Sequence, residues 1–359
     1  MDADLPYWLA LIRFLPFGSV RMQKLMRRFP SMKLAFEASV SSLLEAGIEP
    51  EIANRFLQER LHIFPEVQLP ELEKHGVEAI TLKDPRYPPL LKTLYDPPAV
   101  LFVRGTLPDP TRKHLAVVGS RKASRYGLDM THRLIEPLAA SGVVIVSGLA
   151  YGIDATAHQI TLSVGGTTLA VLGSGVDHES IYPSANRALA SSIIAGGGAI
   201  LSEYPIGTVP LKMHFPIRNR IIAGLCHGTL VVEATIKSGS LITARAALDA
   251  GRDVYAVPGP IDSLLSEGPN NLLKMGATPV TVASDIHEGT RVEKKADTYT
   301  PRNEEERVLY TRLDHNPRHV DELIRETQLD IATLNRTLTL LEMKGVIHHE
   351  GGQYYTKKT

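Results

Sequence analysis

Between about residues 110 and 290, short apolar runs alternate with glycine-rich turns and amphipathic stretches. Because the runs are almost continuously aliphatic, their strands should be buried on both faces, as in a parallel sheet covered by crossover helices. The predicted strands are His114–Val118, Val143–Val146, Thr168–Leu172, Ala199–Ser202, Leu230–Glu233, Val254–Val257 and Pro279–Val282. The pattern predicts a doubly wound α/β fold that binds ligands at the carboxyl ends of its strands. Pro137 should kink or shorten the first crossover helix.

Different patterns flank this predicted sheet. From residue 1 to about residue 65, apolar side chains recur at mixed three- and four-residue spacings, which is typical of helices. Prolines around Asp84–Pro88 exclude a regular helix there and predict an extended lead-in to the sheet. The expected division is a helical domain at 1–68, the α/β domain at 69–290, a polar linker at 291–302 and a further domain at 303–359.

The last of these domains has the pattern of a winged helix. Three predicted helices, at Glu304–Leu313, Val320–Glu326 and Ile331–Lys344, precede a hairpin turn at Gly351-Gly352. In the third helix, Ile331, Leu334, Leu338 and Leu341 fall on one stripe and should face the core. Winged helices read the major groove of DNA, but this domain is net negative. A role in binding protein or a purely structural role is equally compatible.

The composition is that of a folded protein without a strong overall field. The 359 residues include 39 Lys and Arg against 39 Asp and Glu, with 43% hydrophobic and 22% charged residues. Zero net charge excludes a broad DNA-coating surface, so a polyanion should be met by a local patch. The single cysteine excludes an internal disulfide and favours a reducing cytoplasm. No apolar run approaches the roughly 18 residues that span a bilayer, so membrane insertion is not expected.

Several motifs of catalytic sites are missing from the sequence. It contains no Gly-Lys dipeptide, and therefore no Walker A loop, and no His-Glu-x-x-His or Gly-x-Ser-x-Gly motif. A Gly-x-Gly-x-x-Gly fingerprint is also missing after the first predicted strand, which weakens a dinucleotide-binding reading. Asp154 and His158, four residues apart, could form an acid–base pair, but such pairs more often hold a loop. We therefore expect no catalytic residue, metal or cofactor.

Basic residues gather instead in two stretches without an acid, Pro110–Leu128 and Tyr204–Val232. Three turns at predicted strand ends suit anions, and they are Gly119-Ser120-Arg121 followed by Lys122, Gly173-Ser174-Gly175, and Ser238-Gly239-Ser240. Glycine permits close approach of the backbone, and an arginine fork grips a phosphate at two points. Each turn alone is also compatible with an ordinary βα turn or helix N-cap, so only the set predicts a phosphate pocket.

The string Phe215–Arg220 joins an aromatic side chain to two arginines around Asn219. Arginines hold phosphates, and an aromatic ring could stack on an unpaired base. The candidates for stacking are Phe215 and four tyrosines, Tyr126, Tyr151, Tyr182 and Tyr204. One of the arginines could instead form a structural ion pair with Glu233 or Asp154. The string predicts an electropositive, aromatic pocket at the strand ends.

Seven short sequence motifs occur along the chain in an order that resembles a known protein family. The motifs are Val117–Arg121, Ser147–Asp154 with His158, Leu172–Gly175 with Tyr182-Pro183 and Asn186, Ser202–Pro205, Phe215–Arg220, Val232–Ala234 with Ser238–Ala244, and Ala256–Gly259. In this order they resemble the DNA-processing protein A family (DprA, also called Smf), over about residues 75–285. The flanks resemble the family's helical N-terminal domain, of sterile-alpha-motif-like or helix-hairpin-helix type, and the winged helix of some members.

The resemblance implies an extended Rossmann-like core that dimerises and a protein that is not an enzyme. It implies binding and protection of single-stranded DNA and loading of the RecA recombinase onto that DNA in natural transformation. Ser184 stands where some members carry a lysine, so Arg187 would supply that charge. The family's pocket maps onto Arg121, Asn186, Arg187, Arg218 and Arg220. With the anion turns, the predicted DNA-binding set is Gly119, Ser120, Arg121, Lys122, Gly173, Gly175, Asn186, Arg187, Phe215, Arg218, Asn219, Arg220, Ser238, Gly239 and Ser240.

Two other function classes compete with this one. A Rossmann-like phosphoribohydrolase would carry Pro-Gly-Gly-x-Gly-Thr-x-x-Glu, whereas the equivalent region here reads Glu233-Ala234-Thr235-Ile236-Lys237-Ser238. A transcription factor would read duplex DNA with its winged helix, and the near-neutral third helix of this domain argues against that.

Overall fold

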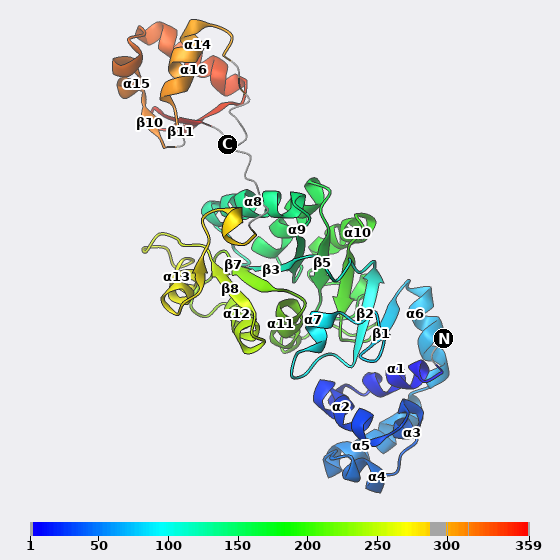
Figure 1. Cartoon of the computed structure of the whole chain (residues 1–359). Helices are drawn as coiled ribbons and strands as arrows, with labels where there is room; N and C mark the ends of the chain where they lie inside the picture. The colour runs from blue at the N-terminus through cyan, green and yellow to red at the C-terminus, as the bar shows by residue number, and fades with distance from the viewer. Residues whose placement is uncertain (1–2, 288–298, 300, 315, 358–359) are drawn as a thin grey trace. The chain divides into compact units, whose positions relative to one another are not determined.

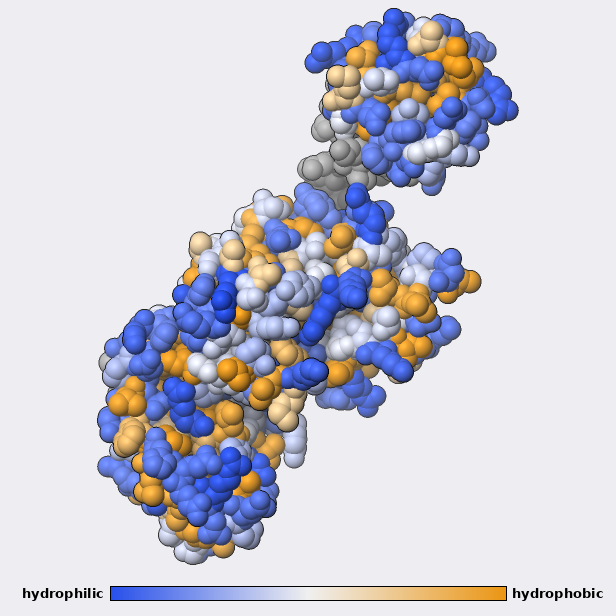
Figure 2. Space-filling view, turned by 180° about the vertical axis from the view of Figure 1, so that it is seen from behind, coloured by the Kyte–Doolittle hydropathy of each residue, from blue (hydrophilic) through white to orange (hydrophobic). Residues whose placement is uncertain are grey.

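The computed structural model describes residues 3–287, 299, 301–314 and 316–357. The chain divides into two compact units, Met1–Val292 and Glu293–Thr359. Most of the predicted linker at 291–302 lies outside the described residues. Hydrophilic and hydrophobic side chains are interspersed over the face that Figure 2 displays, as a neutral composition leads one to expect. Among the described residues, no helix has both the length and the apolar character needed to cross a membrane.

A nine-stranded sheet runs through the first unit in the order β1-β2-β6-β5-β4-β3-β7-β8-β9 (Figure 1). The strands are β1 (Glu78–Thr81), β2 (Val100–Gly105), β3 (His114–Val118), β4 (Val144–Ser147), β5 (Thr168–Val171), β6 (Ala199–Ser202), β7 (Gly228–Val231), β8 (Asp253–Ala256) and β9 (Thr278–Pro279). From β6 across to β9 the neighbouring strands are parallel. Because the chain adds strands on one side of β3 up to β6 and on the other side from β7, the sheet is doubly wound. The predicted fold class is confirmed.

Helices cover both faces of this sheet (Figure 1). Leu115 and Val117 of β3 share a hydrophobic cluster with residues of α8 and α9, whereas Ala116 and Val118 share one with residues of α11 and α12. The alternation follows from the two-residue period of a strand. The helices of the α/β part are α7 (Pro89–Lys92), α8 (Arg125–Ala140), α9 (Ile153–Ser163), α10 (Arg187–Ala195), α11 (His214–Gly224), α12 (Gly239–Asp249) and α13 (Glu267–Lys274), with single turns η3 (His178–Ser180), η4 (Ser184–Asn186) and η5 (Ala283–Asp285).

Two local features add to what the sequence predicted. Helix α8 continues through Pro137, which lies in its last turn, and ends at Ala140. The lead-in to the sheet contains two strands, β1 and β2, that the apolar pattern did not separate from the proline-rich stretch. Strand β2 pairs with β1 and with β6, antiparallel in both cases, so the lead-in extends the sheet at one edge.

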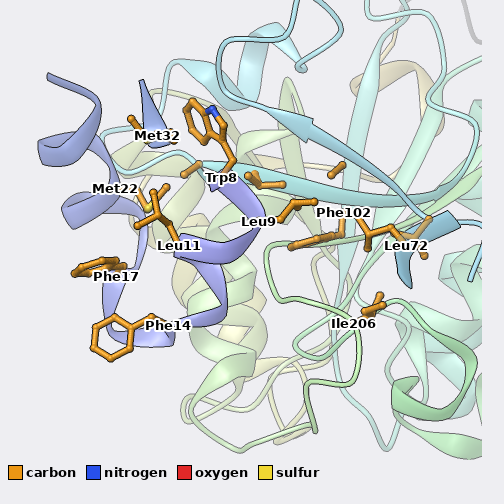
Figure 3. Close-up of a cluster of buried hydrophobic side chains, with 14 of the residues drawn as sticks. Trp8, Leu9, Leu11, Phe14, Phe17, Met22, Met32, Leu72, Phe102 and Ile206 are labelled. Atoms are coloured by element: carbon orange, nitrogen blue, oxygen red, sulfur yellow. The ribbon is translucent and has the colours of Figure 1, made fainter. Parts of the chain in front are cut away.

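Six short helices precede the sheet, which confirms the predicted helical region. They are α1 (Leu5–Arg13), α2 (Ser19–Arg28), α3 (Met32–Phe36), α4 (Val40–Glu45), α5 (Pro50–Glu59) and α6 (Pro65–Lys74), with single turns η1 (Leu15–Phe17) and η2 (Arg60–His62). The rings of Phe14 and Phe17, 4.8 Å apart, lie in their core. Leu9 and Leu72 belong to the same cluster as Phe102 of β2 (Figure 3). The predicted domain boundary at residue 68 falls inside α6.

The second unit is a winged helix, as predicted. It contains α14 (Glu304–Arg312), β10 (Arg318–His319), α15 (Val320–Thr327), α16 (Ile331–Met343), β11 (Ile347–Gly351) and β12 (Tyr354–Lys357). The small sheet has the order β10-β12-β11. Leu334, Leu338 and Leu341 are fully buried, but Ile331 is 61% exposed, so its predicted core position was wrong. Ile331 is the first residue of α16, directly after the N-cap Asp330, and stands at the edge of the core.

Candidate nucleic-acid interface

A small hollow opens at the carboxyl ends of four parallel strands. Open α/β sheets bind their ligands at this edge, so the hollow is the first candidate site. Its lining residues follow β3 (Arg121), β4 (Gly148, Ala150 and Tyr151) and β5 (Tyr182 and Pro183), or lie on α11 after β6 (Phe215 and Arg218). Three residues of the predicted DNA-binding set, Arg121, Phe215 and Arg218, therefore come together here.

Arg218 lines this hollow from a buried position, with 4% of the residue exposed. Its Nη1 atom donates to the carbonyl oxygens of Gly148, at 2.9 Å, and Val171, and its Nε donates to Oδ1 of Asn219 at 3.2 Å. Burial lowers the pKa of Arg218 to about 10, against the opposing charge of Asp154, so the guanidinium stays positive at neutral pH. These bonds leave Nη2 without an acceptor among the described residues. It can therefore donate to an anion in the hollow.

The guanidinium of Arg218 leaves no room for a side chain at position 148. A Cβ atom on Gly148 would lie 2.6 Å from Nη2 of Arg218. The carboxylate of Asp154 accepts from the amides of Gly148, at 3.0 Å, and Ala150, at 3.4 Å, and so fixes this loop. Burial raises the pKa of Asp154. The structure thus supports the loop-holding reading of Asp154 over the acid–base one.

His158 is fully buried and neutral. The Thr168 hydroxyl donates to the carbonyl of Ile145, at 2.7 Å, and accepts from Nδ1 of His158, at 2.6 Å. The imidazole proton is thereby placed on Nδ1, and Nε2 has no partner among the described residues. Burial, and to a smaller extent Arg218, lowers the pKa of His158 to about 3. The side chain therefore contributes no charge near the hollow at neutral pH.

The rim of the hollow combines a cation with aromatic faces. The guanidinium carbon of Arg121 lies 5.6 Å from the ring centre of Phe215, whose ring is 5.7 Å from that of Tyr182. Tyr182 and Tyr151 are 45% and 48% exposed. Arginine and aromatic faces side by side suit a phosphate and an unpaired base. The sequence pointed to these tyrosines only as neighbours of Phe215, because nothing local separates them from other aromatic residues.

Two glycines let the Arg121 turn approach the loop after β4. Gly152 has φ +71°, and a Cβ atom there would lie 2.3 Å from the Ser120 carbonyl. A Cβ atom on Gly119 would lie 2.6 Å from the Ile153 side chain. The two loops are therefore in backbone contact, which explains the Gly119-Ser120 pair by packing. The Ser120 hydroxyl accepts from the Lys122 amide at 3.1 Å, and Lys122 itself is exposed.

Arg220 was predicted to bind DNA, but it does not line the hollow in the described part of the chain. Its Nε lies 2.9 Å from Oδ2 of Asp96 and its Nη2 lies 2.6 Å from Oε2 of Glu203. Nη2 also donates to the Ser19 hydroxyl at 3.0 Å. The alternative of a structural ion pair describes Arg220, although its partners are not the expected Glu233 or Asp154. These ion pairs give Arg220 a structural role, and its direct contact with DNA stays a prediction.

Four other predicted residues brace the loops around the hollow. Asn186 donates from Nδ2 to the Leu149 carbonyl at 2.8 Å, and Arg187 donates from Nη2 to the Glu179 carbonyl at 2.5 Å. Asn219 donates from Nδ2 to the Gly239 carbonyl at 3.1 Å. The fourth, Ser238, is the N-cap of α12 and accepts from the Ser240 amide at 3.3 Å. These side chains hold backbone carbonyls or a helix end, so their direct contact with DNA stays a prediction.

The glycines of the Gly173-Ser174-Gly175 turn have packing reasons of their own. A Cβ atom on Gly173 would lie 3.2 Å from the Phe215 ring, and one on Gly175 would lie 2.3 Å from the Asp177 carboxylate. The Gly175 amide donates to the Thr208 carbonyl at 2.9 Å and is not available to an anion. Within the described residues, no three His, Cys, Asp or Glu side chains are grouped to hold a metal ion.

A doubly wound sheet whose strand ends form a basic, aromatic hollow defines a Rossmann-like protein of the nucleotide- or nucleic-acid-binding class. The sequence model described as "DNA recombination-mediator protein A" matches residues 78–291, and the model of the "DprA winged helix domain" matches residues 293–353. The chain belongs to the DNA-processing protein A (DprA/Smf) family.

Several relatives show the same correspondence. Protein Smf of Escherichia coli is 46% identical over 250 residues, which cover 68% of this chain and 65% of that protein. Protein Smf of Synechocystis is 32% identical and matches 99% of this chain and 100% of its own length. The crystal structure of DprA from Streptococcus pneumoniae has a TM-score of 0.61 and 35% identity, and covers 79% of this chain and 93% of its own. DprA from Helicobacter pylori, described as having a unique single-stranded DNA binding mode, has a TM-score of 0.52 and 30% identity, covering 58% and 93%.

Proposed function

We propose that this protein binds single-stranded DNA in the hollow at the ends of β3–β6 and protects it. One observation carries the proposal: Arg121 and Arg218, neither paired with a carboxylate of the described residues, lie beside the rings of Phe215 and Tyr182. The guanidinium groups would hold the phosphates, and the rings would stack on the bases. The single-stranded DNA binding named for the Helicobacter pylori relative supports the same ligand.

The ligand should be a single strand because of the aromatic rim of the hollow. In a duplex the base faces are stacked on one another and cannot reach a protein ring. Phe215, Tyr182 and Tyr151 therefore favour unstacked bases.

The proposal has no catalytic step. The acid and base nearest the hollow, Asp154 and His158, hold backbone amides and a threonine hydroxyl. We propose a cytoplasmic, non-enzymatic mediator that acts as a homodimer and passes the bound strand to the RecA recombinase. Its support is family membership and the description of the matching family as a recombination mediator. Two hollows in a dimer would raise the avidity for one strand through effective concentration.

Fluorescence anisotropy with a labelled oligonucleotide, over a series of salt concentrations, tests the DNA-binding part. We expect the single strand to bind more tightly than the duplex, and Arg121→Ala with Arg218→Ala to weaken binding by roughly a hundredfold or more, since hydrogen bonds to charged groups are worth about 1.5–3 kcal/mol each. The salt slope of log K should fall by about 0.7 for each phosphate that the variant no longer neutralises. Arg245→Ala, which removes an exposed arginine of α12, is the matched control.

Equal or tighter binding of the duplex would contradict the single-strand proposal, and undiminished binding by the double variant would contradict the site. Thermal melting identifies any loss that comes from unfolding. The recombinase part has its own measurement, the rate of RecA filament assembly on single-stranded DNA with and without this protein. An unchanged assembly rate would contradict the recombinase part and leave the DNA-binding part intact. Light scattering of the purified chain tests the homodimer.

A further inference from the structure

Arg220 connects four segments that are distant in the sequence. Its guanidinium contacts Asp96 in the connection between α7 and β2, Glu203 directly after β6, and Ser19, the first residue of α2. We refer to these four residues as the Arg220 cluster. Two carboxylates share one guanidinium, so the cluster carries no positive charge to offer a phosphate.

Arg220 lies on the same short helix as two residues that line the hollow. Helix α11 has 11 residues and carries Phe215, Arg218 and Arg220. At about 100° per residue, Arg218 and Arg220 point to nearly opposite sides of the helix. Arg218 lines the hollow, while Arg220 binds Ser19 at the start of α2 and Glu203 at the end of β6. A shift or rotation of α11 at Arg220 would therefore move the guanidinium and the ring that face the ligand.

The burial of the cluster makes its pairing costly to break. The side chains of Arg220 and Glu203 are only 15% and 13% exposed, and that of Asp96 is 36% exposed. Burial raises the pKa of Glu203, with Arg220 opposing this effect. Removal of Arg220 leaves two carboxylates without a cation, and loss of either carboxylate removes one of the contacts that hold the guanidinium, so the helix and its neighbours must then rearrange or admit water. The N-terminal end of α11 is held separately, by His214, whose ring stacks on Tyr204 and whose Nδ1 lies 3.1 Å from the Gly173 carbonyl.

We propose that Arg220 is a positioning residue for the hollow: through Glu203, Asp96 and Ser19 it fixes α11, and with it Phe215 and Arg218, without contacting DNA itself. This inference rests on the proposed function. The inference predicts an effect on DNA affinity opposite to the one expected from charge alone. Neutralising an acid near a polyanion site normally strengthens binding, whereas neutralising Glu203 weakens it here, because the acid holds the helix in place.

The test compares Glu203→Gln, Asp96→Asn and Arg220→Lys in the full chain, with oligo(dT) as the probe. Each change keeps the approximate shape of the side chain while weakening the cluster. We expect the dissociation constant for the single strand to rise about fivefold to tenfold, with the salt slope of the wild-type protein. Glu59→Gln is the matched control, since Glu59 belongs to an exposed ion pair with Arg55 on α5. That variant should bind as the wild type does, or slightly more tightly.

A stoichiometric titration separates positioning from simple loss of stability. A destabilised protein shows a smaller active fraction with an unchanged dissociation constant, whereas a misplaced helix shows full stoichiometry with a raised one. If Glu203→Gln does not fold, Asp96→Asn decides, because its side chain is more exposed.

Three results would overturn the inference. Wild-type affinity or better in both Glu203→Gln and Asp96→Asn, alongside weakened binding by Arg121→Ala, would show that the cluster does not position the hollow. A salt slope reduced in Arg220→Gln, which removes the positive charge, as much as in Arg121→Ala would show direct phosphate contact. If Arg121→Ala also leaves binding unchanged, the proposed function fails first and this inference falls with it.

Discussion

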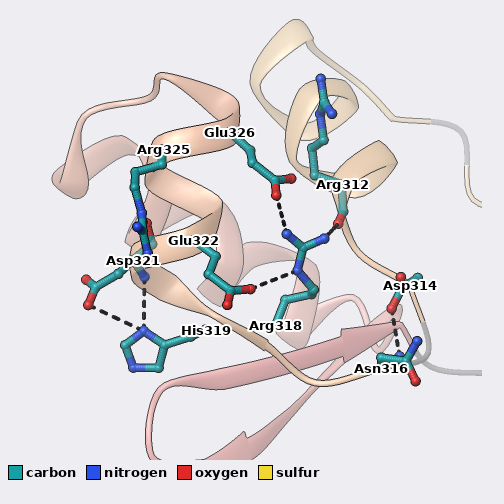
Figure 4. A network of polar contacts seen from close by, with 9 residues as sticks. All are labelled: Arg312, Asp314, Asn316, Arg318, His319, Asp321, Glu322, Arg325 and Glu326. Atoms are coloured by element: carbon teal, nitrogen blue, oxygen red, sulfur yellow. Dashed lines mark hydrogen bonds and ion pairs between the residues drawn. The ribbon is translucent and has the colours of Figure 1, made fainter.

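The hollow and the winged helix both carry arginines, but of the two regions only the winged helix has arginines that pair with acids in the described part of the chain. In the winged helix, Arg318 lies between Glu322 and Glu326 (Figure 4), and Arg336 pairs with Glu305 at 2.8 Å. In the hollow, Arg121 and Arg218 pair with no carboxylate of the described residues. A guanidinium already bound to an acid gains little from a phosphate, because the acid must first be displaced. The availability of arginines, more than their number, therefore distinguishes a polyanion site from a solvated surface.

This difference also bears on the role of the winged helix. Arg336 lies on α16, the helix that would enter the major groove, and Glu305 on α14 neutralises it. The pairing favours the protein-binding or structural reading of this unit over duplex recognition. The following predictions test the contrast, beginning with the largest expected effect.

Phe215→Ala should weaken binding of single-stranded DNA by about 1–3 kcal/mol, roughly fivefold to a hundredfold, because one base loses its stacking partner. The salt slope should not change, since the same phosphates remain neutralised. Anisotropy titrations at two salt concentrations measure both quantities. Leu248→Ala, which truncates a half-exposed apolar side chain on α12, is the control. Unchanged affinity in Phe215→Ala would show that the Phe215 ring does not take part in binding DNA.

Gly148→Ala should weaken the same binding by about tenfold, because its Cβ would lie 2.6–2.8 Å from the guanidinium atoms of Arg218 and displace them. Gly18→Ala is the matched substitution, since nothing lies within 4 Å of a Cβ at that position. Equal binding by both variants would show that the exact place of Arg218 does not matter.

His158 should make the first unit sensitive to acid. Its pKa in the folded protein is about 3, below the usual value of 6.5, so the unfolded chain binds the proton first as pH falls. Stability should therefore drop by about 1.4 kcal/mol for each pH unit between roughly 6.5 and 3. Thermal melts at pH 7.5 and 5.5 should show a larger loss in the wild type than in His158→Gln. Equal losses in the two proteins would show that the imidazole is not held neutral.

Glu305→Gln in the winged helix releases Arg336 from its exposed ion pair. We expect the affinity for single-stranded or duplex DNA to change by less than about twofold, the usual scale of surface pairs. A tenfold gain, measured with either DNA, would overturn the protein-binding or structural interpretation of this unit, because it would show that one carboxylate masks a second DNA-binding surface.

The sequence predicted the features that depend on the local pattern of residues, namely the strands and part of the hollow. Strands β3–β8 were placed within about two residues because burial on both faces makes them aliphatic throughout. Arg121 could be found because it follows a strand end, and Phe215 because it stands close to two arginines, both in stretches without an acid. The partners of Arg220 could not be found, since Ser19 lies 201 residues away and Glu203 lies 17 residues away, on other elements. Ile331 was misplaced because periodicity does not show where a core ends.

All the residues that line the hollow come from one unbroken stretch of chain, Arg121 to Arg218. The Arg220 cluster reaches outside it, through Ser19 and Asp96. A descendant without the N-terminal helices would therefore inherit every lining residue together with a less firmly held α11. Its affinity for single-stranded DNA would be lower but not lost, and new contacts to α11 could restore it.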